Sequence, residues 1–288
     1  MEKKATIICL IFVASIVLSA VAFIIFSGIT AGEYNYVLLE INPKVEFLCD
    51  KNYKVVSVNP VNDDARVLLA GENYKGMDIT KASTDFIDLC AQAGYIDVDG
   101  DDNAVNITII DGITQALDVH VTQGVYNYLR KNEILCAVVE NYEDRHMFDE
   151  KKKNSVCCAN KFKMMQTMQT YLPDYDIKSL NKLSEVELID VINDIHIDQK
   201  YSPTDDEISL KESLINSNKD KYDFHKSKIT NDTQREFTNK FDKYQKTTAQ
   251  SYMTDFNKFY RSWQDKCISW QQTIYFWQIQ HVLLPLIK

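Results

Sequence analysis

The feature that most constrains this chain is an uninterrupted apolar run from Ala5 to Thr30, which contains no charged residue. A transmembrane helix needs about 20 apolar residues, whereas the core of a cleavable signal peptide has about 7 to 15, so the length favours a retained anchor. Lys3 and Lys4 precede the run and Glu33 follows it. Because cationic residues stay on the cytoplasmic side, we predict a single-pass protein of the cell membrane, with a cytoplasmic stub at residues 1–4, that run as its transmembrane helix and an extracellular C-terminus.

The net charge is −9, and the negative charge lies in the middle of the chain, whereas residues 206–288 are mildly basic. Phosphate binding requires clustered Lys and Arg, so the composition argues against nucleic acid as a partner. The basic tail can still contact anionic lipid.

Cysteine and histidine spacing gives no sign of a metal site. An extracellular location permits disulfides, but Cys90 and Cys136 fall in apolar helix and strand patterns, where a thiol packs as a small apolar group. Buried thiols are the favoured interpretation, and one or more disulfides are the alternative. The histidines show no paired spacing, and the adjacent Cys157 and Cys158 have no Cys-x-x-Cys partner, so neither a metal nor another cofactor is predicted.

Residues 34–198 alternate between strand and helix patterns. This pattern predicts an α/β (α+β) domain with a mixed sheet flanked by helices, in which incomplete alternation indicates strands covered on both faces. The expected strands are Tyr34–Ile41, Val45–Leu48, Lys54–Val58, Ala104–Ile110 and Ile134–Val139. Asn62 and Asp63 are expected to cap the first helix. The expected helices are Asp64–Ala70, Thr80–Ala93, Thr114–Arg130, Lys151–Tyr171 and Leu183–Ile195.

Residues 199–205 are expected to form a linker, and residues 206–288 a helical tail. Thr204 and Glu207 have the spacing of a capping box. Beyond Asn231, apolar positions recur about every 3.6 residues, which is typical of a nearly straight helix rather than a strict heptad. We expect a helical hairpin or coiled, self-associating tail, and the alternative is docking of its aromatic end, Trp263 to Ile287, on a membrane or partner.

The dipeptide Asn42-Pro43 lies between two predicted strands, in the string LEINPKVE. An asparagine amide nitrogen can attack its own carbonyl carbon, close a five-membered imide and expel the nitrogen of the next residue, and a tertiary proline amide accepts torsional strain more readily. The reaction needs a fold that holds a near-attack geometry. Asn-Pro is also an ordinary turn signal, as Asn59-Pro60 illustrates.

The strings YVLLEINPKVEF and VVSVNPVNDDARVLL, followed by an amphipathic helix ending in AGYI, resemble the ectodomain of the RsgI-type anti-sigma-I factors of Gram-positive bacteria. The resemblance covers about Leu10 to Ile195. It implies that Asn42 is the self-cleaving asparagine and Pro43 the new N-terminus, with the two fragments held together by strand pairing until the outer part is removed and intramembrane proteolysis follows.

The chain departs from the family's pattern at Glu40, where Asp is usual, and at Lys44, where a small serine is common, so both are supporting site residues. We also expect no cytoplasmic anti-sigma domain in this sequence, because the predicted stub is too short to bind a sigma factor. The acidic stretch Asp97–Asp102 resembles part of a calcium loop but has no closing glutamate, so a solvated turn is expected.

Two hypotheses follow. The first is an anchored extracytoplasmic sensor or signalling module that cleaves itself once at Asn42-Pro43 and acts with another membrane signalling protein or with processing proteases. The second is a non-cleaving envelope interaction protein that binds a partner, itself or the membrane through its C-terminal aromatic helix. Neither hypothesis includes multiple-turnover enzyme activity.

Overall fold

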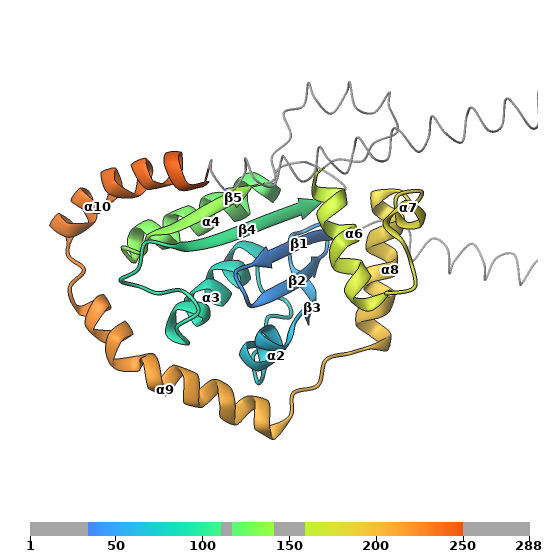
Figure 1. The fold of residues 1–288 in the computed structure, drawn as a ribbon, viewed down its shortest axis with the longest axis horizontal. Coiled ribbons are helices and arrows are strands. Elements are labelled where there is room, and N and C mark those ends of the chain that lie inside the picture. The colour runs from blue at the N-terminus through green and yellow to red at the C-terminus, as the bar shows by residue number, and fades with distance from the viewer. Residues whose placement is uncertain (1–33, 111–116, 141–158, 250–288) are drawn as a thin grey trace, which may run out of the picture.

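The computed structural model describes residues 34–110, 117–140 and 159–249, which form a five-stranded mixed sheet with helices on both faces (Figure 1). The strand order is β3-β2-β1-β4-β5, and every neighbouring pair is antiparallel except β4 and β5, which are parallel. The first strand of the chain is therefore the central strand of the sheet. The strands are β1 (Asn35–Glu40), β2 (Lys44–Cys49), β3 (Val55–Pro60), β4 (Asn103–Ile110) and β5 (Cys136–Glu140).

Both faces of the sheet are buried, which explains the incomplete alternation in the sequence. On β1, Val37 and Leu39 join one apolar cluster, whereas Tyr36 and Leu38 join the other, and all four side chains are fully buried. A strand alternates its side chains between two faces, so a strand covered on both sides carries apolar residues at consecutive positions. The predicted α+β sheet is confirmed.

The first cluster lies under α2 (Asp63–Leu69), α3 (Ile79–Gln92) and α4 (Leu117–Lys131). The second lies under α6 (Ala159–Tyr171), α7 (Ile177–Leu180) and α8 (Glu185–Asp198). The sequence did not predict α7, because a helix of a single turn is too short to show apolar periodicity. The predicted starts of α4 and α6 fall partly outside the described residues.

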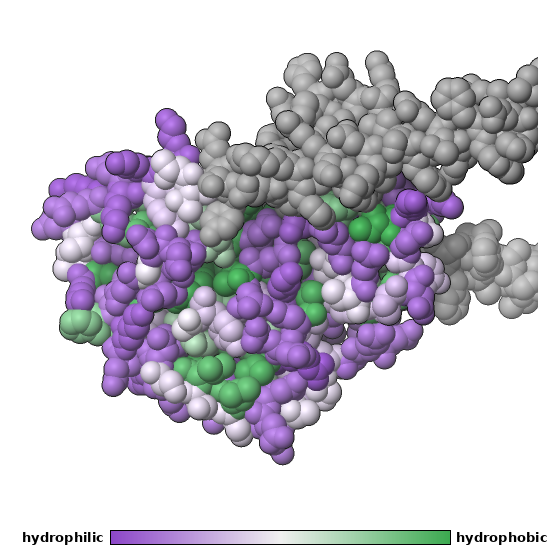
Figure 2. Space-filling model, viewed as in Figure 1, coloured by the Kyte–Doolittle hydropathy of each residue, from purple (hydrophilic) through white to green (hydrophobic). Residues whose placement is uncertain are grey.

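Helix α9 (Asp205–Ser227) and helix α10 (Asn231–Tyr244) run around the outside of this body (Figure 1), and α10 continues as the short π-helix η1 (Gln245–Ala249). The predicted capping box at Thr204 and Glu207 is present at the start of α9. Thr230 caps α10, so the chain changes direction between the two helices. Figure 2 shows that the visible face is mainly hydrophilic, with an apolar patch near α9.

The described part of the tail is covered by the α+β body and not by a helical hairpin. Phe241 of α10 is fully buried in the first cluster, and Leu214, Ile215 and Tyr222 of α9 pack against the same cluster. The predicted helical hairpin or self-associating tail extends beyond the described residues and stays a prediction. The sequence stripe marked a buried face correctly but could not say which surface buries it.

The remaining predictions about the chain ends lie outside the described residues, including the anchor at Ala5–Thr30 and the aromatic end from Trp263. Within the described residues, no helix is both long enough and apolar enough to cross a bilayer.

Among the described residues, Cys49, Cys90 and Cys136 are buried thiols outside any disulfide, as predicted for Cys90 and Cys136. Burial raises the pKa of Cys136 to about 12, so this thiol is protonated and unreactive at neutral pH.

Candidate functional site

The Asn42-Pro43 dipeptide lies in a tight turn between β1 and β2. The strand register pairs Glu40 with Lys44, which leaves Ile41, Asn42 and Pro43 as the turn. The backbone amide of Ile41 donates to the Pro43 carbonyl at 2.9 Å. Asn42 has φ +83°, a left-handed conformation that asparagine adopts more readily than most residues. The dipeptide is therefore held in a defined conformation.

Asn62 holds the side chain of Asn42. Its own side-chain oxygen accepts from the backbone amides of Lys44 at 3.0 Å and Ala65 at 3.2 Å, the second of which makes it the N-cap of α2. Its amide nitrogen then donates to Oδ1 of Asn42 at 2.9 Å. Because two backbone groups fix which way the Asn62 amide faces, the orientation of the Asn42 amide is fixed as well.

Glu40 and Lys44 form an ion pair across the ends of the two strands, with 3.2 Å between Lys44 Nζ and Glu40 Oε1. The second carboxylate oxygen of Glu40 accepts from Lys163 of α6 at 3.0 Å and from Asn106 of β4 at 3.1 Å. The two departures from the family's pattern therefore contact each other. They close the hairpin and connect the end of β1 to its other neighbours.

The structure places all four predicted site residues at the same end of the β1–β2 hairpin: Asn42 and Pro43 in the turn, and Glu40 and Lys44 as the strand pair that flanks it. Asn62 was predicted only as a helix cap, and its contact with Asn42 was missed. The sequence showed only that Asn62 lies between a predicted strand and a predicted helix. As a cap, Asn62 marks the start of α2. Its position next to the β1–β2 turn depends on the order of the strands in the sheet.

A second polar cluster lies on the face of the sheet that α6 and α8 cover. Its centre is Glu46 of β2, which is fully buried. Its carboxylate accepts from the hydroxyls of Tyr36 at 2.6 Å and Tyr171 at 2.9 Å, and it lies 3.2 Å from Nε2 of His196. Burial, followed by the nearby Glu46 charge, raises the pKa of both tyrosines far above the usual value. The cluster connects β2 to α6 and α8.

The acidic stretch Asp97–Asp102 contacts helix α9. Lys221 lies 2.5 Å from the Asp97 carboxylate, and His225 lies 3.2 Å from that of Asp99. The hydrogen bond from Lys221 lowers the pKa of Asp97. No group of His, Cys, Asp or Glu in the described ranges is arranged to hold a metal ion.

Residues 34–167, which contain the whole Asn42 turn, match the anti-sigma factor RsgI-like central domain. The matched residues include the whole five-stranded sheet and its Asn-Pro turn. Residues 34–167 of this chain are therefore similar to the central domain of RsgI-type anti-sigma factors.

Curated relatives with similar sequences are also anti-sigma-I factors. The chain is 35% identical over 79 residues to anti-sigma-I factor RsgI3 of Acetivibrio thermocellus, a match that covers 27% of this chain and 12% of that protein. It is 34% identical over 79 residues to RsgI4 of the same organism, covering 27% and 15%. It is 30% identical over 64 residues to anti-sigma-I factor RsgI of Bacillus subtilis, covering 22% and 17%. The matched stretch is thus less than a fifth of each relative.

Proposed function

We propose that this protein is a membrane-anchored extracytoplasmic signalling module that cleaves its own backbone between Asn42 and Pro43. The observation that carries the proposal is the left-handed turn in which Asn62 fixes the Asn42 amide. The similarity of residues 34–167 to the central domain of anti-sigma factors supports a signalling function.

In the proposed reaction, Nδ2 of Asn42 attacks the carbonyl carbon of the same residue. The new Nδ2–C bond closes an imide ring, the C–N bond to Pro43 breaks, and the proton lost by Nδ2 passes to the proline nitrogen, which becomes a free secondary amine. The donor from Asn62 stabilises the negative charge that develops on Oδ1 as Nδ2 loses its proton. The left-handed backbone of Asn42 holds the turn away from the relaxed extended conformation.

Strand pairing would keep the two fragments together after cleavage. The N-terminal fragment would end in β1, which pairs along its length with β2 on one side and with β4 on the other. Tyr36, Val37, Leu38 and Leu39 are fully buried. Burying such a side chain stabilises by about 1.5–3 kcal/mol, so these four contribute on the order of 6–12 kcal/mol before the entropy of ordering the strand is subtracted.

Release of the outer fragment from β1 would be the step that transmits the signal. With the anchor at Ala5–Thr30 and the remainder outside the membrane, removal of the fragment that begins at Pro43 would leave β1 attached to the anchor and without its partners. A force along the β1 axis loads both ladders together, so release would require many hydrogen bonds to break at once. We propose that the fragment left in the membrane is then cut by membrane proteases or binds a second membrane signalling protein.

The test uses the full chain and two matched variants. Mass spectrometry of the denatured protein is expected to show one fragment that ends at Asn42 and another that begins with Pro43, whereas native size-exclusion chromatography shows one species. Asn42→Ala is expected to abolish the fragments. Asn59→Ala is the control, because the Asn59-Pro60 bond lies in strand β3, where the Asn59 amide nitrogen donates to Tyr171 at 3.0 Å.

An uncleaved native chain would refute the proposal. It would favour the second candidate, an interaction protein that uses its C-terminal aromatic helix while the α+β domain stays intact.

A further inference from the structure

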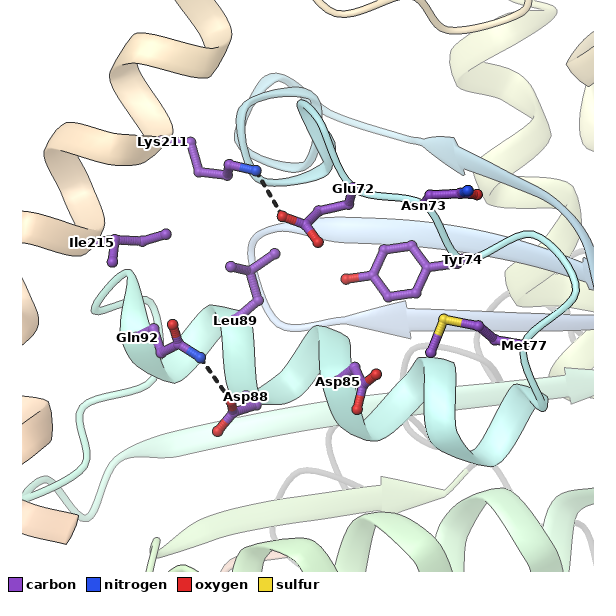
Figure 3. Close-up of a pocket in the computed structure, with 10 residues that line it drawn as sticks. All are labelled: Glu72, Asn73, Tyr74, Met77, Asp85, Asp88, Leu89, Gln92, Lys211 and Ile215. Carbon is purple, nitrogen blue, oxygen red and sulfur yellow. Dashed lines mark hydrogen bonds and ion pairs between the residues drawn. The ribbon is translucent and has the colours of Figure 1, made fainter.

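A polar cavity of about 450 Å³ opens between α3, helix α9 and the segment that joins α2 to α3 (Figure 3). Cavities of this size hold small molecules. One wall belongs to residues 34–167, whereas Lys211 and Ile215 of α9 lie outside the residues matched to the family's central domain. The cavity is therefore completed by the C-terminal part of the chain and lies apart from the Asn42 turn.

Tyr74 points its hydroxyl into this cavity (Figure 3). The residue is only 4% exposed, and its ring packs edge-to-face on Phe47 with 5.7 Å between ring centroids. Within the described ranges, no protein group forms a hydrogen bond with the Tyr74 hydroxyl, which faces the cavity. A buried, rigidly held hydroxyl that faces a cavity is thus available to a ligand.

The charges around this hydroxyl are mainly negative. Glu72, Asp85 and Asp88 line the cavity, and Lys211 is the cationic residue of the lining. Burial, followed by these carboxylates, raises the pKa of Tyr74 well above its usual value. A ligand group that carries positive charge would be attracted to these carboxylates beside the phenol oxygen.

The carboxylates also have fixed positions. Glu72 pairs with Lys211 at 2.7 Å, and Asp88 accepts from Gln92 at 2.7 Å and from Tyr222 at 2.5 Å. Lys81 pairs with Asp85 from the exposed side of α3, and Lys226 lies 3.8 Å from the Asp88 carboxylate. These contacts leave the carboxylates spread along the wall, and no metal-binding group forms among the described residues. The arrangement suits an extended organic cation better than a single ion.

We propose that this cavity binds a small organic cation through a primary ammonium group that donates to the Tyr74 hydroxyl oxygen and to the adjacent carboxylates. The apolar side chains of Met77, Leu89 and Ile215 would contact the hydrocarbon part of the ligand. This site does not depend on cleavage at Asn42 and adds a binding function to the proposed signalling module.

Isothermal titration of the full chain, kept in detergent because of its apolar first segment, tests the proposal with a matched pair of probes. Putrescine has an ammonium group at each end of a four-carbon chain, and 1,4-butanediol is its neutral counterpart. Saturable binding of putrescine is expected, with no detectable binding of the diol. Binding should weaken as salt is raised, because screening reduces the attraction of the carboxylates.

Tyr74→Phe removes the hydroxyl and retains the ring that packs on Phe47, and it is expected to weaken putrescine binding roughly tenfold. Tyr95→Phe is the control, because the Tyr95 hydroxyl donates to Asp64 at 3.0 Å outside the cavity. Asp85→Asn provides a second variant that keeps the side-chain shape and should also weaken binding. Equal binding of the two probes, or native affinity in both Tyr74→Phe and Asp85→Asn, would overturn the proposal.

Discussion

Replacing Asn62 with aspartate separates the two kinds of hydrogen bond that its side chain makes. An aspartate can still accept from the backbone amides of Lys44 and Ala65, which now bond to the Asn62 oxygen at 3.0 and 3.2 Å. Aspartate and asparagine are comparable N-caps, so the free energy of unfolding should change by less than about 0.5 kcal/mol. A carboxylate, however, cannot donate to Oδ1 of Asn42.

The expected effect on self-cleavage is much larger than the effect on stability. Losing the 2.9 Å hydrogen bond to Asn42 removes a contact worth about 0.5–1.5 kcal/mol, which alone slows the reaction roughly 2- to 12-fold. The carboxylate would also repel Oδ1 and attract Nδ2, which turns the attacking nitrogen toward residue 62. Because misplacement of reacting atoms by about 1 Å costs about 100-fold, we expect cleavage to slow by 10- to 100-fold in total.

The assay is a time course of pulse-labelled, cell-free synthesis, with the fraction cleaved read on denaturing gels. Asn62→Ala is the comparison variant, since it should slow cleavage and also destabilise α2 by about 1 kcal/mol through loss of its cap. Cleavage of Asn62→Asp at the native rate would refute the argument that Asn62 positions the attacking amide.

Three further predictions concern stability. Leu38→Ala, at a fully buried position on β1, should lower the free energy of unfolding by about 2–5 kcal/mol in urea titrations and should speed separation of the cleaved fragments on size-exclusion chromatography. Glu46→Ala should cost roughly 3–5 kcal/mol by the same titration, because its buried donors lose their acceptor, whereas Glu46→Gln, which keeps an acceptor, should cost less. Lys221 lowers the pKa of Asp97, so this pair should stabilise the fold above the unfolded pKa of about 3.9 and lose that effect as pH falls through the lower folded value. Lys221→Met should thus cost under about 1 kcal/mol at neutral pH and nothing at the acid end, and a constant difference across pH would contradict this assignment.

The strands and most helices could be predicted because their signals are local. Apolar residues at consecutive positions in YVLL indicated a strand covered on both faces, and the caps Asn62 and Thr204 marked the starts of two helices. The same local reading failed for α7, which is too short to show a period, and for the surface that buries α9. A periodic stripe shows that a helix face is buried and carries no information about its partner.

The candidate site was predictable in part. The Asn42-Pro43 chemistry follows from the side chain and the next bond, and Glu40 and Lys44 were named because they depart from the pattern of the family that the sequence resembles. The contact between Asn62 and Asn42 and the cluster around Glu46 were not predictable. His196 lies 150 residues from Glu46 along the chain, so no local pattern relates them.

Three features of this protein follow from the sequence by itself. They are an apolar run long enough to span a membrane, a series of amphipathic helices and strands, and an Asn-Pro bond between two strands. The tertiary structure decided that β1 is the central strand, that Asn62 reaches the turn and that α9 completes a cavity at Tyr74. The physical reason is that helix and strand formation depend on the side chains of neighbouring residues. Sheet order and helix docking depend on which arrangement buries all the apolar faces together.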